Sequence, residues 1–354
     1  MNITGLFLFP FAVIYGFIVF CRNKLFDFSV LKSKSFNIPI ISVGNLSMGG
    51  TGKTPHIEYL IRLLQKNYKI TTLSRGYGRK TKGFLWVDKH ADSAKAGDEA
   101  LQYCRKFPEI TVALDEKRVH GVSKIISDKP ETEVILLDDA FQHRYIKPGL
   151  SVLLTDFYKP FFQDFIFPSG TLRESKKGMK RADIIVVTKS PKILSPIIRK
   201  SMEEEMKLKP FQQVYYSYID YGGLQPMNTF SENLKPDKVS CILMIAGIAN
   251  PYPFEEQLKT MADTVESIIF NDHYQFQEKD MKKIKNYFEA IFSKNKIIVT
   301  TEKDAMRIKD TELMSFFVNL PFFFLPIEVK FHKKDKEMFD KQIIEYVRKN
   351  KANH

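Results

Sequence analysis

The chain has 354 residues, 44% of them apolar, and its 54 basic and 41 acidic side chains give a net charge of +13. This length suffices for two domains, and three scattered cysteines argue against a disulfide scaffold or a zinc site and fit a reducing compartment. The basic excess favours an anionic partner such as a phosphorylated substrate or a membrane surface. No RNA- or DNA-binding motif accompanies it, so we expect no nucleic acid.

The N-terminal segment is apolar and aromatic. Residues 1–21 contain no charged side chain, and Arg22 and Lys24 follow at once. About 20 helical residues span close to 30 Å, so we expect a membrane-anchoring helix over residues 1–24, with the rest of the chain on the cytoplasmic side. A buried core helix is an alternative. A secretory signal peptide is disfavoured because a basic first region and a small-residue cleavage site are missing.

A glycine-rich loop, residues 44–54, follows the apolar run 38–43 and precedes a helical stretch, 55–65. Glycines allow backbone N–H groups to surround phosphates, a lysine meets the β and γ charges, and a threonine hydroxyl reaches Mg²⁺. The strict phosphate-loop pattern has glycine where this chain has Ser47. We predict that the nucleotide is held by Gly49, Gly50, Thr51, Gly52, Lys53 and Thr54.

Two adjacent acids, Asp138 and Asp139, end the buried-strand pattern of residues 133–137. P-loop enzymes place the carboxylate on the metal side at the end of such a strand, and Mg²⁺ needs few protein ligands. We therefore predict a Mg²⁺ site formed by Thr54 with Asp138 or Asp139. Further strand patterns alternate with helical ones, which predicts an α/β fold with a parallel, P-loop NTPase-type sheet between layers of helices. These patterns cover residues 69–73, 151–155 and 183–187.

Two later segments allow alternative interpretations. Residues 156–167 are rich in aromatic side chains, which either pack in the core or against the N-terminal helix, or touch lipid; core packing is favoured. Residues 188–191 follow a strand as a guanine-specificity motif does in a GTPase. Pro191 stands where that motif requires aspartate, so ATP is favoured over GTP.

The domain organisation follows from these patterns. We expect a P-loop kinase lobe over 25–210, a strand-like linker over 211–237, and a second, smaller α/β lobe over 238–354. The second lobe has strand patterns at 241–246, 296–300 and 322–329 and a terminal helical pattern at 336–349.

With these pieces in place, the chain resembles the tetraacyldisaccharide 4'-kinase family, the lipid A kinases of Gram-negative bacteria. The resemblance covers nearly the whole chain, and the loop beginning at Ser47 is itself a family trait. Ala140 departs from the glycine most often found after the acid pair. The matching strings, in the order of the family, are residues 42–55, 73–79, 97–99, 138–144, 168–174, 272–273 and 301–304.

The resemblance implies transfer of the γ-phosphoryl group of ATP to the 4'-hydroxyl of tetraacyldisaccharide 1-phosphate. It implies ATP and Mg²⁺ as cofactors, the lipid A disaccharide precursor as partner, and a location on the cytoplasmic face of the inner membrane. We also expect a monomer. It also implies two lobes that close on the nucleotide. The rival hypothesis is a membrane-anchored P-loop ATPase switch without a lipid acceptor.

The resemblance also assigns roles that the residues alone do not. Asp98, which by itself reads as a helix N-cap, would act with His273 and Lys53 in catalysis. The nucleotide would also be held by Glu302, Lys303 and Asp304. The lipid would be contacted by Arg75, Tyr77, Arg79 and His143, with Arg144 in the same cleft. Arg173 and Glu174 would contact the substrate or the metal.

Overall fold

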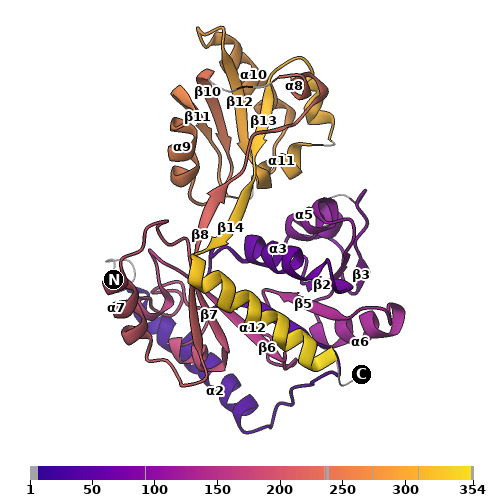
Figure 1. The fold of residues 1–354 in the computed structure, drawn as a ribbon, viewed down its shortest axis with the longest axis vertical. Helices are drawn as coiled ribbons and strands as arrows, with labels where there is room; N and C mark the ends of the chain where they lie inside the picture. The colour runs from indigo at the N-terminus through magenta and orange to yellow at the C-terminus, as the bar shows by residue number, and fades with distance from the viewer. Residues whose placement is uncertain are drawn as a thin grey trace. The chain divides into compact units, whose positions relative to one another are not determined.

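The structure, a computed structural model, describes residues 7–91, 93–234, 236, 239–272, 274–309 and 311–351. It divides into two compact units (Figure 1): unit 1 is residues 1–219 and 329–354, and unit 2 is residues 220–328. The chain passes into unit 2 along strand β8 (Gln213–Tyr221) and returns along β14 (Ile327–Phe331).

Unit 1 is built on one long sheet. Its other strands are β1 (Ile40–Asn45), β2 (Ile70–Ser74), β3 (Leu85–Trp86), β4 (Thr111–Leu114), β5 (Val134–Asp138), β6 (Leu150–Asp156) and β7 (Ile184–Thr188). The order is β14-β8-β7-β6-β1-β5-β2-β4-β3. All pairs from β8 to β4 are parallel, and β3 is antiparallel to β4. This confirms the predicted α/β fold, with the glycine-rich loop after a central strand.

Helices cover both faces of this sheet because successive strand residues point to opposite sides. Ile41 and Val43 of β1 belong to one core cluster, whereas Ile40 belongs to another. The first cluster lies under α3 (Lys53–Leu64), α5 (Asp98–Lys106) and α12 (Lys333–Lys351). The other face is covered by α6 (Arg118–Asp128) and α7 (Pro196–Met206). A short helix, α4 (Ser93–Ala96), precedes α5.

The C-terminal helix α12 belongs to unit 1. The prediction of a second lobe over 238–354 is therefore wrong for residues 329–354, which return to unit 1. Phe339, Ile343 and Val347 of α12 lie in the core beneath the unit 1 sheet. Burial of these three apolar side chains, each worth roughly 1.5–3 kcal/mol, is the physical reason for the return.

Unit 2 is a smaller α/β layer. Its strands are β9 (Gln225–Pro226), β10 (Val239–Ala246), β11 (Ala262–Ile269), β12 (Lys296–Thr301) and β13 (Phe322–Leu325), in the order β11-β10-β12-β13-β9. Its helices are α8 (Thr229–Glu232), α9 (Tyr252–Lys259), α10 (Glu278–Ala290) and α11 (Glu302–Ile308). The single strand expected at 322–329 is wrong, since Pro326 separates β13 from β14, which join different sheets.

The apolar N-terminal pattern forms helix α2 (Phe9–Asp27). Among the described residues it is the one helix long and apolar enough to cross a membrane, and only 11% of that apolar stretch is buried. A core helix would be mostly buried, so that alternative is wrong. Its exposed apolar side chains include Phe9, Phe11, Val13, Ile14, Phe17, Ile18 and Phe20.

The aromatic segment 156–167 divides between core and surface. Phe161 and Phe162 are buried in the cluster beneath α7, which confirms the core interpretation for them. Tyr158 is 74% exposed. Phe167 meets Tyr15 of α2 edge to face at 5.9 Å, so the segment also packs against the N-terminal helix.

Candidate active site

The glycine-rich loop leaves the centre of the unit 1 sheet at Asn45 and enters α3 at Lys53. Gly49 and Gly52 have φ values of 108° and 84°, a region that side chains disfavour. Asn45 Nδ2 donates to the Thr51 hydroxyl at 2.8 Å and holds the loop to its strand. Because the first N–H groups of a helix lack partners within the helix, the start of α3 is suited to bind an anion.

The predicted acid pair lies beside this loop. Asp138 ends β5 and is in register with Val43 of β1. Lys53 Nζ lies 3.7 Å from Asp139 Oδ1, and Arg173 Nη1 donates to both Asp139 oxygens at 3.0 Å. Burial disfavours charge on Asp139, but Lys53 and then Arg173 outweigh burial and hold its pKa below the ordinary value.

Asp138 has the properties of a metal ligand. Burial, together with the neighbouring Asp139 charge, raises the pKa of Asp138 to about 6. Among the described residues, its buried Oδ1 has no hydrogen-bond partner, while Oδ2 accepts from the Tyr103 hydroxyl at 3.0 Å. The described part of the chain has no cluster of three or more His, Cys, Asp or Glu able to hold a metal. The unpaired Oδ1 of Asp138, together with Thr54, suits Mg²⁺, because this ion needs few protein ligands and takes water and phosphate oxygens as the others.

Helix α5 brings Asp98 to the same edge of the sheet. Asp98 lies in its first turn, and Tyr103 on the same helix binds Asp138 and hydrogen bonds to Thr54. Burial, and then the Asp138 charge, raises the pKa of Tyr103 well above its usual range, so the phenol stays protonated and donates. Glu58 of α3 anchors the rest of α5, accepting from Gln102 Nε2 at 2.7 Å and pairing with Lys106 Nζ at 2.8 Å.

A cationic cluster adjoins the acid pair. Burial, followed by the charges of Arg118, Arg22 and Arg75, lowers the pKa of His143 to about 4. Arg118 is 3% exposed, its Nη1 donates to the Asp115 carbonyl at 2.7 Å, and burial lowers its pKa to about 10. Sequence reasoning missed Arg118, because an arginine in the first turn of a helix resembles an ordinary surface charge. Neutral His143 among three guanidinium groups is an arrangement suited to an anion.

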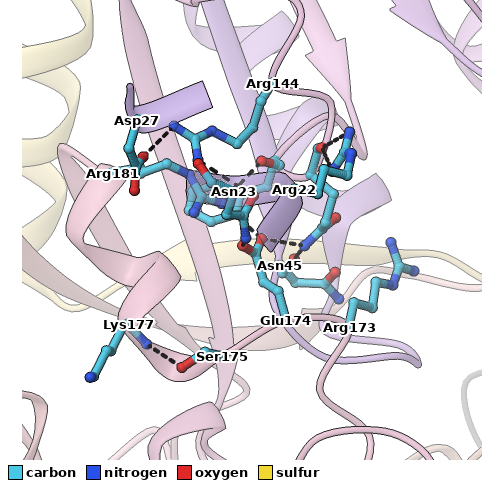
Figure 2. Close-up of polar contacts among 12 residues, drawn as sticks. Arg22, Asn23, Asp27, Asn45, Arg144, Arg173, Glu174, Ser175, Lys177 and Arg181 are labelled. Atoms are coloured by element: carbon cyan, nitrogen blue, oxygen red, sulfur yellow. Dashed lines mark hydrogen bonds and ion pairs between the residues drawn. The ribbon is translucent and has the colours of Figure 1, made fainter. Parts of the chain in front are cut away.

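Two residues expected to contact the lipid hold neighbouring parts of unit 1 instead. Arg79 Nη2 donates to Glu116 Oε1 at 2.6 Å, and its side chain is 2% exposed. Glu174, at 2% exposure, accepts from Arg181 at 2.7 Å and from Asn23 of α2 at 3.0 Å (Figure 2). Each side chain expected at the substrate thus forms an ion pair inside unit 1, although Nε and Nη1 of Arg79 have no hydrogen-bond partner among the described residues.

Helix α2 is attached to this part of unit 1 by its polar face. Arg144 donates to the Asn23 carbonyl and to Asp27 Oδ1, each at 2.8 Å (Figure 2). Arg144 therefore anchors α2. The Tyr15 hydroxyl donates at 2.9 Å to the carbonyl of Arg173, the arginine whose side chain pairs with Asp139. Tyr77, by contrast, is 75% exposed.

The residues expected in unit 2 differ among themselves. Asp304 is fully buried, and its carboxylate accepts from Thr301, Gly247 and Arg307, so it stabilises the start of α11 instead of facing a ligand. Glu302 is 6% exposed. Lys303 Nζ lies 3.7 Å from Asp272. His273, the expected catalytic partner of Asp98, lies outside the described residues.

A family model described as tetraacyldisaccharide-1-P 4'-kinase matches residues 4–348. The chain belongs to the tetraacyldisaccharide 4'-kinase family. It is 44% identical to the tetraacyldisaccharide 4'-kinase of Bacteroides thetaiotaomicron over 358 residues, covering 98% of this chain and 94% of that protein. It is also 44% identical to the kinase of Flavobacterium psychrophilum, with 100% of both chains covered.

A solved family member has the same fold. The crystal structure of the "apo" form of LpxK from Aquifex aeolicus in complex with ATP matches with a TM-score of 0.71 and 28% identity, over 98% of this chain and 99% of that one. The protein is therefore a lipid A biosynthesis kinase of this family, as the sequence resemblance implied. The ATPase switch without a lipid acceptor is not favoured.

Proposed function

We propose that this tetraacyldisaccharide 4'-kinase uses ATP and Mg²⁺, and that its chemistry takes place at the P-loop edge of unit 1. The Aquifex relative was crystallised with ATP, which supports ATP as the donor. The observation that carries the proposal is that Lys53 pairs with Asp139 and that Tyr103, on the helix that begins with Asp98, donates to Asp138, all within unit 1. Such positioning and charge neutralisation are what phosphoryl transfer requires.

Each residue then has a defined task. The loop amides of residues 49–54 and Lys53 bind the β and γ phosphates. Thr54 and Asp138 hold Mg²⁺, and the orphan Oδ1 of Asp138 supports this role. When bound, the metal neutralises charge on the β and γ phosphates. Asp139 and Arg173, joined by two hydrogen bonds, keep Lys53 oriented.

Asp98 acts as the general base. As the 4'-oxygen forms its bond to the γ-phosphorus, the bond from that phosphorus to the bridging oxygen of ADP breaks, and the hydroxyl proton passes to Asp98. The family resemblance gives His273 the task of helping Asp98 to take that proton, with the Asp–His pairing orienting the imidazole. In unit 2, we retain Glu302 and Lys303 as nucleotide contacts and leave Asp304 out, since its oxygens are engaged inside the unit.

The cationic cluster binds the phosphorylated end of the lipid. Arg75 and His143 meet the 1-phosphate and exposed Tyr77 meets the sugar. Buried Arg118 supports this region from within, since its guanidinium donates to the carbonyls of Asp115 and Asp138. Arg79 and Glu174 are left out of the lipid contacts. The exposed apolar face of α2 then inserts into the inner membrane from the cytoplasmic side, and a net charge of +13 suits an anionic surface. The protein works as a monomer in this proposal.

The test compares Asp98→Asn with Glu109→Gln, which removes an exposed carboxylate just beyond α5. Steady-state transfer to tetraacyldisaccharide 1-phosphate and equilibrium ATP binding are measured for both. We expect Asp98→Asn to lower kcat by roughly 10²–10⁴-fold without weakening ATP binding, and Glu109→Gln to behave as wild type. A kcat for Asp98→Asn within twofold of wild type would contradict the assignment of the base.

A further inference from the structure

Side chains from outside the P-loop, residues 49–54, donate hydrogen bonds to its backbone carbonyl groups. The carbonyl oxygens of residues 49–52, four in succession, each lie within hydrogen-bond distance of a side-chain donor. In chain order of the carbonyls, the donors are Asn45 Nδ2 at 3.5 Å, Lys189 Nζ at 2.6 Å, Thr188 Oγ1 at 2.9 Å and His56 Nδ1 at 2.7 Å.

These contacts determine where the opposite side of the loop points. In a planar trans peptide, the C=O of one residue and the N–H of the next point in opposite directions. Holding the carbonyls of residues 49–52 therefore orients the N–H groups of residues 50–53. The Thr51 N–H is bonded within the loop to the Gly49 carbonyl at 3.1 Å, and the other three face away from the donors.

Thr188 is the last residue of β7 and Lys189 follows it, at the position where a GTPase has its guanine-specificity motif. Thr188 is fully buried. Lys189 has a φ of 57°, unusual for a residue with a side chain, and its ammonium group also pairs with Asp156 Oδ2 at 2.8 Å. The Lys189 side chain is 36% exposed, but its ammonium group contacts both the Asp156 carboxylate and the Gly50 carbonyl, so it is held against the loop.

His56 is the third support, and the geometry determines its tautomer. The Gly52 carbonyl can only accept, so Nδ1 carries the proton and donates. Nε2 then accepts from the Ser217 hydroxyl of β8 at 2.9 Å. The side chain is 3% exposed, and a neutral imidazole satisfies both partners.

We propose that Lys189, Thr188 and His56 are positioning residues that pre-organise the P-loop N–H groups for the nucleotide phosphates. The proposal deepens, and rests on, the proposed role of residues 49–54 in binding ATP. None of the three donates to substrate. Without these three side chains, the loop would have to become ordered when the nucleotide binds. The entropy cost of that ordering would weaken the affinity for ATP.

The test uses Lys189→Met, which keeps the apolar stem and removes the donor, and Lys189→Arg, which can restore it. Lys200→Met is the matched control, because the Lys200 side chain is 80% exposed on α7. Asp156→Asn measures the effect of disturbing the ion pair alone. Binding of ATP, tripolyphosphate and adenosine is measured by calorimetry, and thermal unfolding of unit 1 is followed through Trp86, the chain's one tryptophan.

We expect Lys189→Met to weaken ATP and tripolyphosphate binding at least about tenfold, to leave adenosine binding unchanged, and to be partly rescued in Lys189→Arg. Wild-type affinity in Lys189→Met, with or without a lowered Tm, would overturn the proposal. If wild type itself binds no ATP, the proposed function fails instead.

His56 supplies a second pair of variants if Lys189→Met folds poorly. His56→Asn retains a donor near the position of Nδ1, whereas His56→Leu has none. We expect ATP affinity near wild type for the first and clearly weaker for the second, both measured well below the Tm. Equal affinities would show that the donor to Gly52 has no positioning role.

Discussion

The buried histidine behind the P-loop makes the stability of unit 1 depend on pH. Burial, only partly offset by the hydrogen bond to the Gly52 carbonyl, lowers the pKa of His56 from 6.5 to about 4. Between these values the unfolded chain binds the proton and the folded chain does not, so protonation favours unfolding. The stabilisation by neutral His56 is thus complete above the unfolded pKa of 6.5 and is lost as pH falls toward about 4.

The magnitude follows from the two pKa values. At about 1.4 kcal/mol per pH unit, the full difference corresponds to about 3 kcal/mol, and about 2 kcal/mol of it is already lost at about pH 5. His56→Asn cannot titrate in this range but keeps a donor for Gly52. We therefore expect the variant to lose about 2 kcal/mol less than wild type between pH 7.5 and 5.

Urea unfolding monitored by Trp86 fluorescence measures this difference, because Trp86 lies in β3 of unit 1. Half-buried His143, whose pKa is also lowered to about 4, is present in both proteins and cancels. His90→Asn, at an exposed position, is the control and should follow the wild-type pH dependence. Parallel curves for wild type and His56→Asn from pH 7.5 to 5 would refute the reasoning.

Three further changes have defined outcomes. Phe161 is 1% exposed, so Phe161→Ala should lower the free energy of unfolding of unit 1, measured in urea, by about 3–5 kcal/mol. Tyr158 is 74% exposed, so Tyr158→Ala should lower it by less than about 0.5 kcal/mol. Similar losses for the two variants would contradict the packing. Phe11 and Phe17 are 63% and 65% exposed on α2. The double variant Phe11→Ser, Phe17→Ser should co-sediment with anionic vesicles at least about tenfold less than wild type, at unchanged Tm. Unaltered vesicle binding would argue against α2 as the anchor. Arg173→Lys keeps the charge, but the shorter side chain withdraws the donor that Nη1 supplies to both Asp139 oxygens, so kcat/KM should fall about tenfold or more. Wild-type kinetics would show that this contact is dispensable.

The parts of the fold that were predicted correctly depend on local patterns. The apolar run before the glycine-rich loop became β1, and the run before Asp138 became β5, because buried parallel strands are continuously apolar. Strand β11 (Ala262–Ile269) was missed, since it lies at the edge of its sheet and is mostly exposed. Helix α12 was assigned to the wrong unit. Its true unit depends on where the chain runs after Pro326, and no local sequence pattern encodes that path.

The site shows the same division between local and distant information. Lys53 and Asp139 were predicted from motifs, and their ion pair follows from adjacent parallel strands. Arg79 was expected to meet the lipid, yet its partner is Glu116, 37 residues further along the chain. Charge and spacing do not reveal whether a cation faces a ligand or a distant carboxylate. For the same reason buried Arg118 could not be distinguished from a surface arginine.

The most direct test of the account is transfer of radiolabelled phosphate from ATP to tetraacyldisaccharide 1-phosphate in detergent micelles with Mg²⁺. Wild type and Lys53→Ala are run together, with a lipid-free reaction to measure hydrolysis. The account predicts label in the lipid with wild type, loss of at least about 100-fold with Lys53→Ala, and little phosphate release without lipid. Phosphate released to water with no labelled lipid would contradict it.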